Sequence, residues 1–232
     1  MAERVSEYPF VNRLIDNFAF FLKYFTDHCP FTKPGQLEYH LETIRRRQDL
    51  GSARAALQDK VYLKSLYRTI QAWGIGSRGS KLRPFDDFVS ALNANALEIS
   101  ELDGLKLDQP RLEIDLVVRQ VWKLVDTTEI VENKAKLVPC SKTLHHILPD
   151  LIVPMDREYT QVFFGWQNPR FQYDQAFCFG EAFRAFQKIS KMVNPGQYIG
   201  SGWNASLTKV IDNAVVGLIL YLRSKYEAGE FS

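Results

Sequence analysis

The sequence of 232 residues has few cysteines and no long apolar run. Cys29, Cys140 and Cys178 lie far apart and in no paired spacing, so neither a disulfide framework nor a four-cysteine metal cluster is expected. The most apolar segment, 214–222, is too short to span a membrane. Residues 1–20 lack the basic start, apolar run and cleavage site of a secretion signal. We therefore expect a cytoplasmic protein with no membrane contact.

Histidine is scarce too, with only four residues in the chain. His145 and His146 are adjacent, so they are expected to point to different sides of a helix. The four histidines give no evident zinc site by themselves. The sequence therefore predicts no metal and no other cofactor.

The formal net charge of +2 does not by itself indicate a nucleic-acid-binding protein. Positive charges are nevertheless clustered at 45–47, 78–83 and 134–142, and a local cluster is what a phosphate contact requires. The loop 73–81 is rich in glycine but is no Walker loop, because the Gly-Lys-Ser/Thr ending is absent. This loop and its exit supply three candidate ligands for DNA phosphates, which are Arg78, Lys81 and Arg83.

Helical periodicity, by contrast, is abundant. Apolar residues recur at three- and four-residue spacing over 10–25, which predicts one amphipathic helix. No window alternates with the period of a strand, so an all-α fold is expected, as a single helical domain over residues 1–232 with two lobes and a cleft between them. Further helices are predicted over 36–48, 52–73 with a break near Asp59, 85–92, 111–125, 173–193 and 206–226.

Residues 137–165 contain the residues best suited to catalysis. Lys142 is predicted at the head of a helix that stops near Pro149, and Asp156 is predicted to cap the next helix, over 157–165. A helix N-terminus and apolar surroundings both disfavour an ammonium group, so a lowered pKa is expected for Lys142. A lysine of this kind is a nucleophile, and a nearby carboxylate can stabilise a sugar cation.

This segment resembles the helix-hairpin-helix DNA glycosylases. Lys142-Thr143-Leu144 corresponds to the Lys-Thr-Ala part of that family's hairpin, and Met155-Asp156 corresponds to its Val-Asp part, while a looser resemblance covers 55–225. Val138-Pro139-Cys140-Ser141 replaces the hairpin glycines, and the cysteines of the iron–sulfur branch are absent. The chain is most similar to the outlying archaeal oxoguanine glycosylase branch. The resemblance implies a two-lobed helical fold.

The same resemblance implies excision of a damaged or modified base from DNA, with Lys142 as the nucleophile, Asp156 as the stabilising carboxylate and Schiff-base (AP lyase) chemistry. The target nucleotide would be flipped out of the duplex, and a monomer is expected. Additional DNA contacts are expected from Ser141, His145 and His146. Candidates for stacking on the flipped base are Trp203, Trp166 and Tyr159, although each is also a common type of core residue.

Two alternatives stay open at this point. The missing hairpin glycines favour a non-catalytic helix-hairpin-helix-like module that only binds DNA. A defence effector acting on modified foreign DNA would use the same chemistry in another biological role. The paired Lys142 and Asp156 favour an enzyme over the non-catalytic module.

Overall fold

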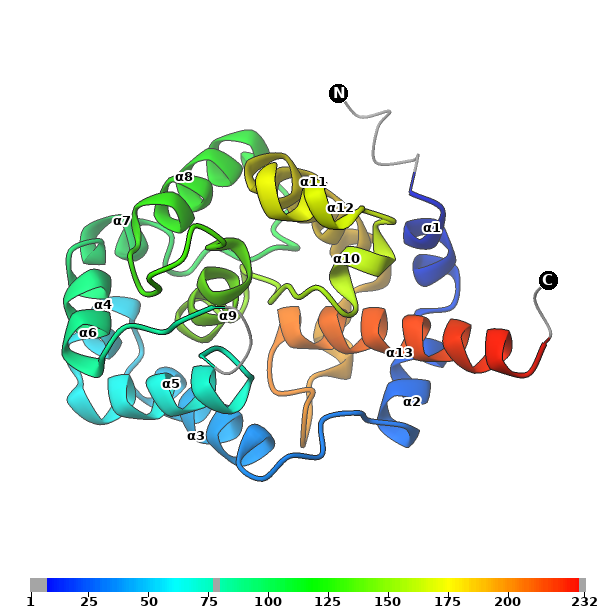
Figure 1. Cartoon of the computed structure of the whole chain (residues 1–232), viewed down its shortest axis with the longest axis horizontal. Helices are drawn as coiled ribbons and strands as arrows, with labels where there is room; N and C mark the ends of the chain where they lie inside the picture. The colour runs from blue at the N-terminus through cyan, green and yellow to red at the C-terminus, as the bar shows by residue number, and fades with distance from the viewer. Residues whose placement is uncertain (1–7, 77–79, 230–232) are drawn as a thin grey trace.

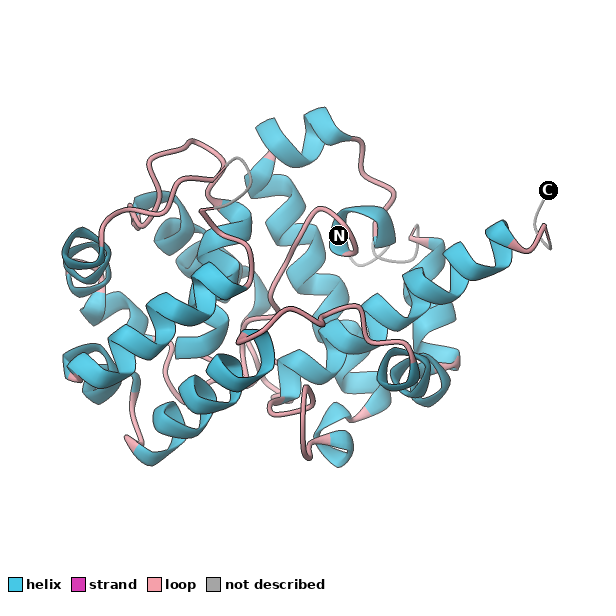
Figure 2. Ribbon diagram, turned by 60° about the horizontal axis from the view of Figure 1, so that its bottom comes forward, coloured by secondary structure: helices cyan, strands magenta, loops and turns pink. Residues whose placement is uncertain are grey.

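The computed structural model describes residues 8–76 and 80–229, and in this part of the chain helices are joined by loops (Figure 1, Figure 2). The described residues contain no strand, only one isolated bridge between Leu82 and Val131. The all-α class predicted from the sequence is therefore confirmed. None of the described helices is long and apolar enough to cross a membrane.

Thirteen α-helices follow one another along the described residues. The first seven are α1 (Pro9–Asp16), α2 (Phe18–Asp27), α3 (Gln36–Asp49), α4 (Ala53–Gln58), α5 (Lys60–Ala72), α6 (Phe85–Asn93) and α7 (Ala96–Glu101). The other six are α8 (Ile114–Thr127), α9 (Leu137–Ile147), α10 (Thr160–Phe163), α11 (Asn168–Tyr173), α12 (Gln175–Val193) and α13 (Leu207–Glu227).

Most of these helices lie where the periodicity predicts them. The break at Asp59 is confirmed, and its carboxylate caps α5 by accepting the Tyr62 N–H at 2.6 Å. The single helix predicted over 10–25 is wrong, because Asn17 separates α1 from α2. The Asn17 side-chain amide donates to the Arg13 carbonyl at 3.2 Å, and a side-chain bond of this kind competes with continuation of the helix.

The helices α3 to α8 lie on one side of Figure 1 and enclose α9, whereas α1, α2 and α10 to α13 lie on the other side. The first two helices of the chain, α1 and α2, therefore lie in the same group as the last four. The backbones of α2 and α13 touch, since a Cβ atom at Gly217 would lie 1.9 Å from the Phe21 carbonyl oxygen. Only glycine fits at this contact.

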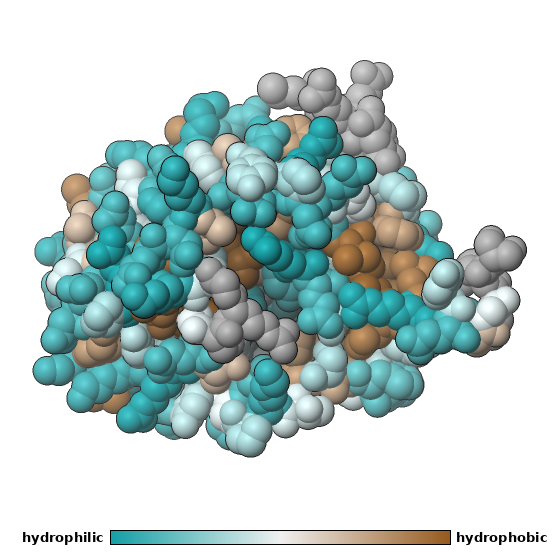
Figure 3. Space-filling view, viewed as in Figure 1, coloured by the Kyte–Doolittle hydropathy of each residue, from teal (hydrophilic) through white to brown (hydrophobic). Residues whose placement is uncertain are grey.

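The buried apolar side chains form one continuous cluster through the described residues. Helix α9 runs through it, and Val138 and Lys142 are its only residues that are not fully buried. A separate apolar patch is exposed near α10 and α13 in Figure 3 and includes Phe10, Val162 and Leu222. The position of α9 decides where Lys142 reaches the surface.

Candidate active site

Lys142 and Asp156 line one surface groove with a cavity volume of about 740 Å³. A narrow recess of about 50 Å³ adjoins this groove. Phe31, Gln36 and Trp73 line both cavities, as do Lys142 and Asp156, so the recess opens from the groove beside the lysine and the aspartate. The structure therefore brings the two predicted catalytic residues to one place.

Lys142 is the sixth residue of α9 rather than its first. The helix begins earlier than predicted because Pro139 falls in its first turn, where a proline is tolerated. Burial, and not the helix terminus, lowers the pKa of Lys142, while the charge of Asp156 opposes that shift. The Lys142 Nζ donates to the Trp73 carbonyl at 3.3 Å. None of the ion pairs among the described residues involves Lys142.

Asp156 lies just before α10 and fixes the turn that leads into it. Its Oδ1 accepts from the backbone N–H of Tyr159 at 2.7 Å and of Thr160 at 3.3 Å. The predicted helix cap is wrong, because the regular helix is only Thr160–Phe163 and its N-cap is Tyr159, which makes no side-chain cap bond. Asp156 instead holds the turn before α10. The backbone holds Oδ1, whereas Oδ2 accepts no hydrogen bond from the described residues and remains available to a ligand.

A buried ion pair forms the inner end of the recess. Lys209 Nζ lies 2.5 Å from Asp212 Oδ2 and 2.7 Å from Asn213 Oδ1, and the lysine is only 1% exposed. Burial raises the pKa of Asp212, and the charge of Lys209 opposes this effect. Four rings surround the ammonium with centroids at 5.1–5.8 Å, which are those of Phe25, Phe31, Trp73 and Trp203. Such distances allow cation–π attraction.

Two of the three predicted stacking residues line these cavities. Trp203 lines the recess and meets Phe31 edge-on, with ring centroids 5.2 Å apart. Tyr159 lines the groove. Trp166 is 6% exposed and stacks on Phe164 at 4.4 Å, so it is a core residue that lines neither cavity.

The residues of α9 predicted to contact DNA are buried. Ser141, His145 and His146 are each 0% exposed. The Ser141 hydroxyl accepts the Met155 N–H at 3.1 Å and so ties α9 to the connector before Asp156. A phosphate contact through these three side chains does not agree with this burial, because the core would have to open.

The basic residues at and after the glycine-rich loop lie differently from the prediction. Arg78 lies outside the described residues. Lys81 pairs with Glu132 at 2.7 Å, and Arg83 pairs with Glu129 at 3.2 Å. Neither Lys81 nor Arg83 lines the groove. The exposed basic side chains that do line it are Lys33, Lys134 and Arg157.

Four residues of the recess, namely Phe31, Gln36, Trp73 and Lys209, escape sequence reasoning because they come from distant segments. Among these four residues, only Lys209 offers a local signal in the sequence. It lies three residues before Asp212 on an apolar helix, and two opposite charges at that spacing on an apolar helix indicate a buried ion pair. Searches against protein families, curated proteins and solved structures found no match. The geometry of the site therefore carries the functional argument.

Proposed function

We propose that the protein is a DNA glycosylase that excises a damaged or modified base, with Lys142 as the nucleophile and Asp156 as the stabilising carboxylate. One observation carries the proposal. A desolvated lysine with no ion-pair partner among the described residues stands beside a carboxylate, where a wide groove meets an aromatic recess. A groove suits the duplex, and a recess suits a base turned out of it.

The lysine acts first. Because burial lowers the pKa of Lys142, more of its amine is neutral at a given pH than for an exposed lysine. The nitrogen lone pair attacks C1′ of the nucleotide, and the C1′–N bond breaks with its electron pair leaving on the base, which then takes up a proton. The C1′–O4′ bond then breaks, O4′ takes up the remaining proton of the nitrogen, and an imine forms on Lys142. Loss of the C2′ proton to solvent expels the 3′ phosphate with the electron pair of the C3′–O bond, which cleaves the strand.

The carboxylate acts on the charge that develops during this step. Breaking the C1′–N bond builds positive charge on the deoxyribose, and the Asp156 carboxylate stabilises that charge electrostatically. The backbone amides of Tyr159 and Thr160 hold Oδ1 in place, so no reorganisation of the carboxylate is needed.

The recess receives the base. Its rings offer faces for stacking, and Gln36 supplies an amide. A cavity of about 50 Å³ holds a few water molecules rather than a nucleobase, so Trp203 and Phe31 move apart when the base enters. The rim residues Lys33, Lys134 and Arg157 contact the phosphates of the flanking strand. We expect the protein to act as a monomer on each damaged or modified base.

The test is reductive trapping of the protein on duplexes that each carry one oxidised, alkylated or enzymatically modified base. Borohydride reduces the imine to a stable amine, so the wild-type protein becomes covalently attached to one or more of the duplexes. Lys142→Gln keeps the side-chain length and polarity but forms no imine, so trapping disappears. The matched control is Lys64→Gln, an exposed lysine on α5 outside both cavities, and it is trapped like wild type.

Trapping of Lys142→Gln at the wild-type level would refute the assignment of the nucleophile. Tight binding of these duplexes without trapping or base release on any of them would refute the enzyme and favour a DNA-binding module instead.

A further inference from the structure

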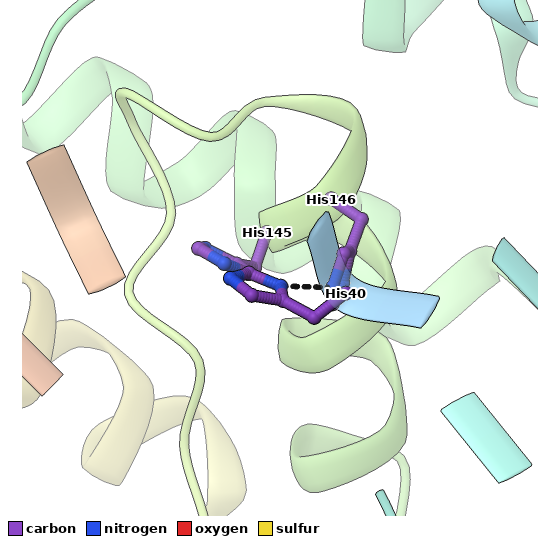
Figure 4. A group of neighbouring side chains, drawn as sticks. All are labelled: His40, His145 and His146. Carbon is purple, nitrogen blue, oxygen red and sulfur yellow. Dashed lines mark hydrogen bonds between the residues drawn. The ribbon is translucent and has the colours of Figure 1, made fainter. Parts of the chain in front are cut away.

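Three histidines from two helices meet in the core behind the recess (Figure 4). His40 comes from α3, whereas His145 and His146 are neighbours on α9, and all three are 0% exposed. One ring nitrogen from each lies within 4.8 Å of the others. The expectation that His145 and His146 point to different sides of the helix is therefore wrong. Both imidazole rings lie in the same cluster, and their centroids are 4.9 Å apart.

The hydrogen bonds around the cluster fix which nitrogens carry protons. His145 Nδ1 lies 3.0 Å from the Ile152 carbonyl, and His146 Nδ1 lies 2.8 Å from the Lys142 carbonyl. A carbonyl oxygen only accepts, so each Nδ1 donates and each Nε2 keeps a lone pair. This arrangement, in which a backbone carbonyl holds Nδ1 and Nε2 carries the lone pair, is the one that metal-binding histidines use.

The cluster also contains unsatisfied nitrogens. His40 Nδ1 donates to the His146 Nε2 lone pair at 3.0 Å, so an ion that binds His146 replaces this hydrogen bond. Two further buried nitrogens, His40 Nε2 and His145 Nε2, have no hydrogen-bond partner among the described residues. Buried polar atoms are almost always paired, so two bare lone pairs in one cluster indicate a missing partner.

We propose that His40, His145 and His146 bind one divalent transition-metal ion of the zinc class, with water as the fourth ligand. Neutral imidazole suits Zn²⁺, Co²⁺, Ni²⁺ and Cu²⁺, while the cluster contains none of the carboxylates that Mg²⁺ and Ca²⁺ require. The proposal does not depend on the glycosylase function.

The electrostatics of the surroundings are compatible with a cation. Burial lowers the pKa of all three histidines, that of His146 to about 4, so the rings are unprotonated and able to ligate at neutral pH. The ammonium of Lys209 acts on each histidine, and the charge of Lys142 acts on His146 as well. Lys209 is itself paired with Asp212.

The ion would join α3 to α9 one turn beyond Lys142. It would reach the cluster from the recess, since the His40 ring stacks on Trp203 at 5.6 Å and lies 5.2 Å from Trp73, and both indoles line the recess. Metal binding would therefore stiffen the inner face of the recess and raise the melting temperature.

The experiment starts from chelator-treated full-length protein, to which Zn²⁺ or Co²⁺ is added alone. We expect one ion per chain by calorimetry, a raised melting temperature, and the visible absorption of tetrahedral Co²⁺. X-ray absorption at the zinc edge should show imidazole nitrogens at about 2.0–2.1 Å. His40→Gln and His145→Gln should each abolish stoichiometric binding.

The fourth histidine provides the matched control. His28 is exposed and stacks on Tyr24 at 4.1 Å, so His28→Gln should bind metal like wild type. If the His40 and His145 variants do not fold, the spectra of the wild-type protein decide, because they report the ligands directly. Absence of stoichiometric binding, an oxygen-only coordination shell, or loss of binding in His28→Gln would overturn the proposal.

Discussion

Replacing Lys209 by methionine removes the ammonium from the buried pair and leaves Asp212 without its partner. Lys209 is 1% exposed and Asp212 is 7% exposed, so solvent cannot replace the lost contact. Breaking a buried pair on one side costs about 3–5 kcal/mol of unfolding free energy. Asn213 also loses its 2.7 Å contact, which costs about 1–3 kcal/mol when an acceptor is left unsatisfied.

The loss should depend on pH, because Asp212 can take up a proton instead. Its pKa is already raised by burial, and it rises further without the lysine. A carboxyl group whose folded-state pKa exceeds its unfolded value stabilises the fold below the unfolded pKa, and that stability is lost as the pH rises through the folded pKa. The destabilisation of Lys209→Met is therefore larger at about pH 8 than at about pH 5, with a slope of at most about 1.4 kcal/mol per pH unit.

The assay is urea unfolding followed by circular dichroism at both pH values. Lys209→Met combined with Asp212→Leu should recover most of the loss, since an apolar pair needs no counter-charge. Lys64→Met, at an exposed lysine of α5, is the control and should change little. Equal destabilisation at both pH values, with no recovery in the double variant, would refute a buried ionised pair.

Three further substitutions test the site and the fold. Asp156→Asn keeps an acceptor for the Tyr159 N–H, so the melting temperature should stay near the wild-type value. The trapping rate should fall on the order of a hundredfold or more, because the charge is lost. A lower melting temperature with an unchanged trapping rate would show that Asp156 has only a structural role. Trp203→Ala should weaken binding of modified duplex relative to plain duplex by about 1–3 kcal/mol, and an unchanged ratio with a lower melting temperature would assign the indole to packing. Gly217→Ala places a Cβ atom against the Phe21 carbonyl, so the unfolding free energy should drop by about 3 kcal/mol, and a drop below about 1 kcal/mol would contradict the contact between α2 and α13.

The helices were predictable from the sequence because helical periodicity is local. The predicted ends of α3 and α5 lie within one residue of those observed. The two missed helices, α7 and α11, have six residues each and a single buried one, Ile99 and Phe171, so neither shows a period. The break at Asn17 depends on one side-chain hydrogen bond, which apolar spacing does not reveal.

The candidate site was predictable only where its residues are close in the sequence. Lys142 and Asp156 lie fourteen residues apart and were found together. His40 and His146 are 106 residues apart, and only the packing of α3 on α9 brings them together. The sequence predicts a turn at the position where α9 begins, so it places Lys142 at a helix terminus, whereas the structure places it in the second turn of the helix.

The most direct test of the account is to locate the trapped DNA on the chain. Two lysines, Lys142 and Lys209, line the recess, and only Lys142 lacks an ion-pair partner among the described residues. Proteolysis of the borohydride-reduced complex followed by mass spectrometry identifies the modified residue. We predict a deoxyribose remnant on Lys142 alone, whereas a remnant on Lys209, or no adduct with any modified duplex, would contradict the proposed mechanism.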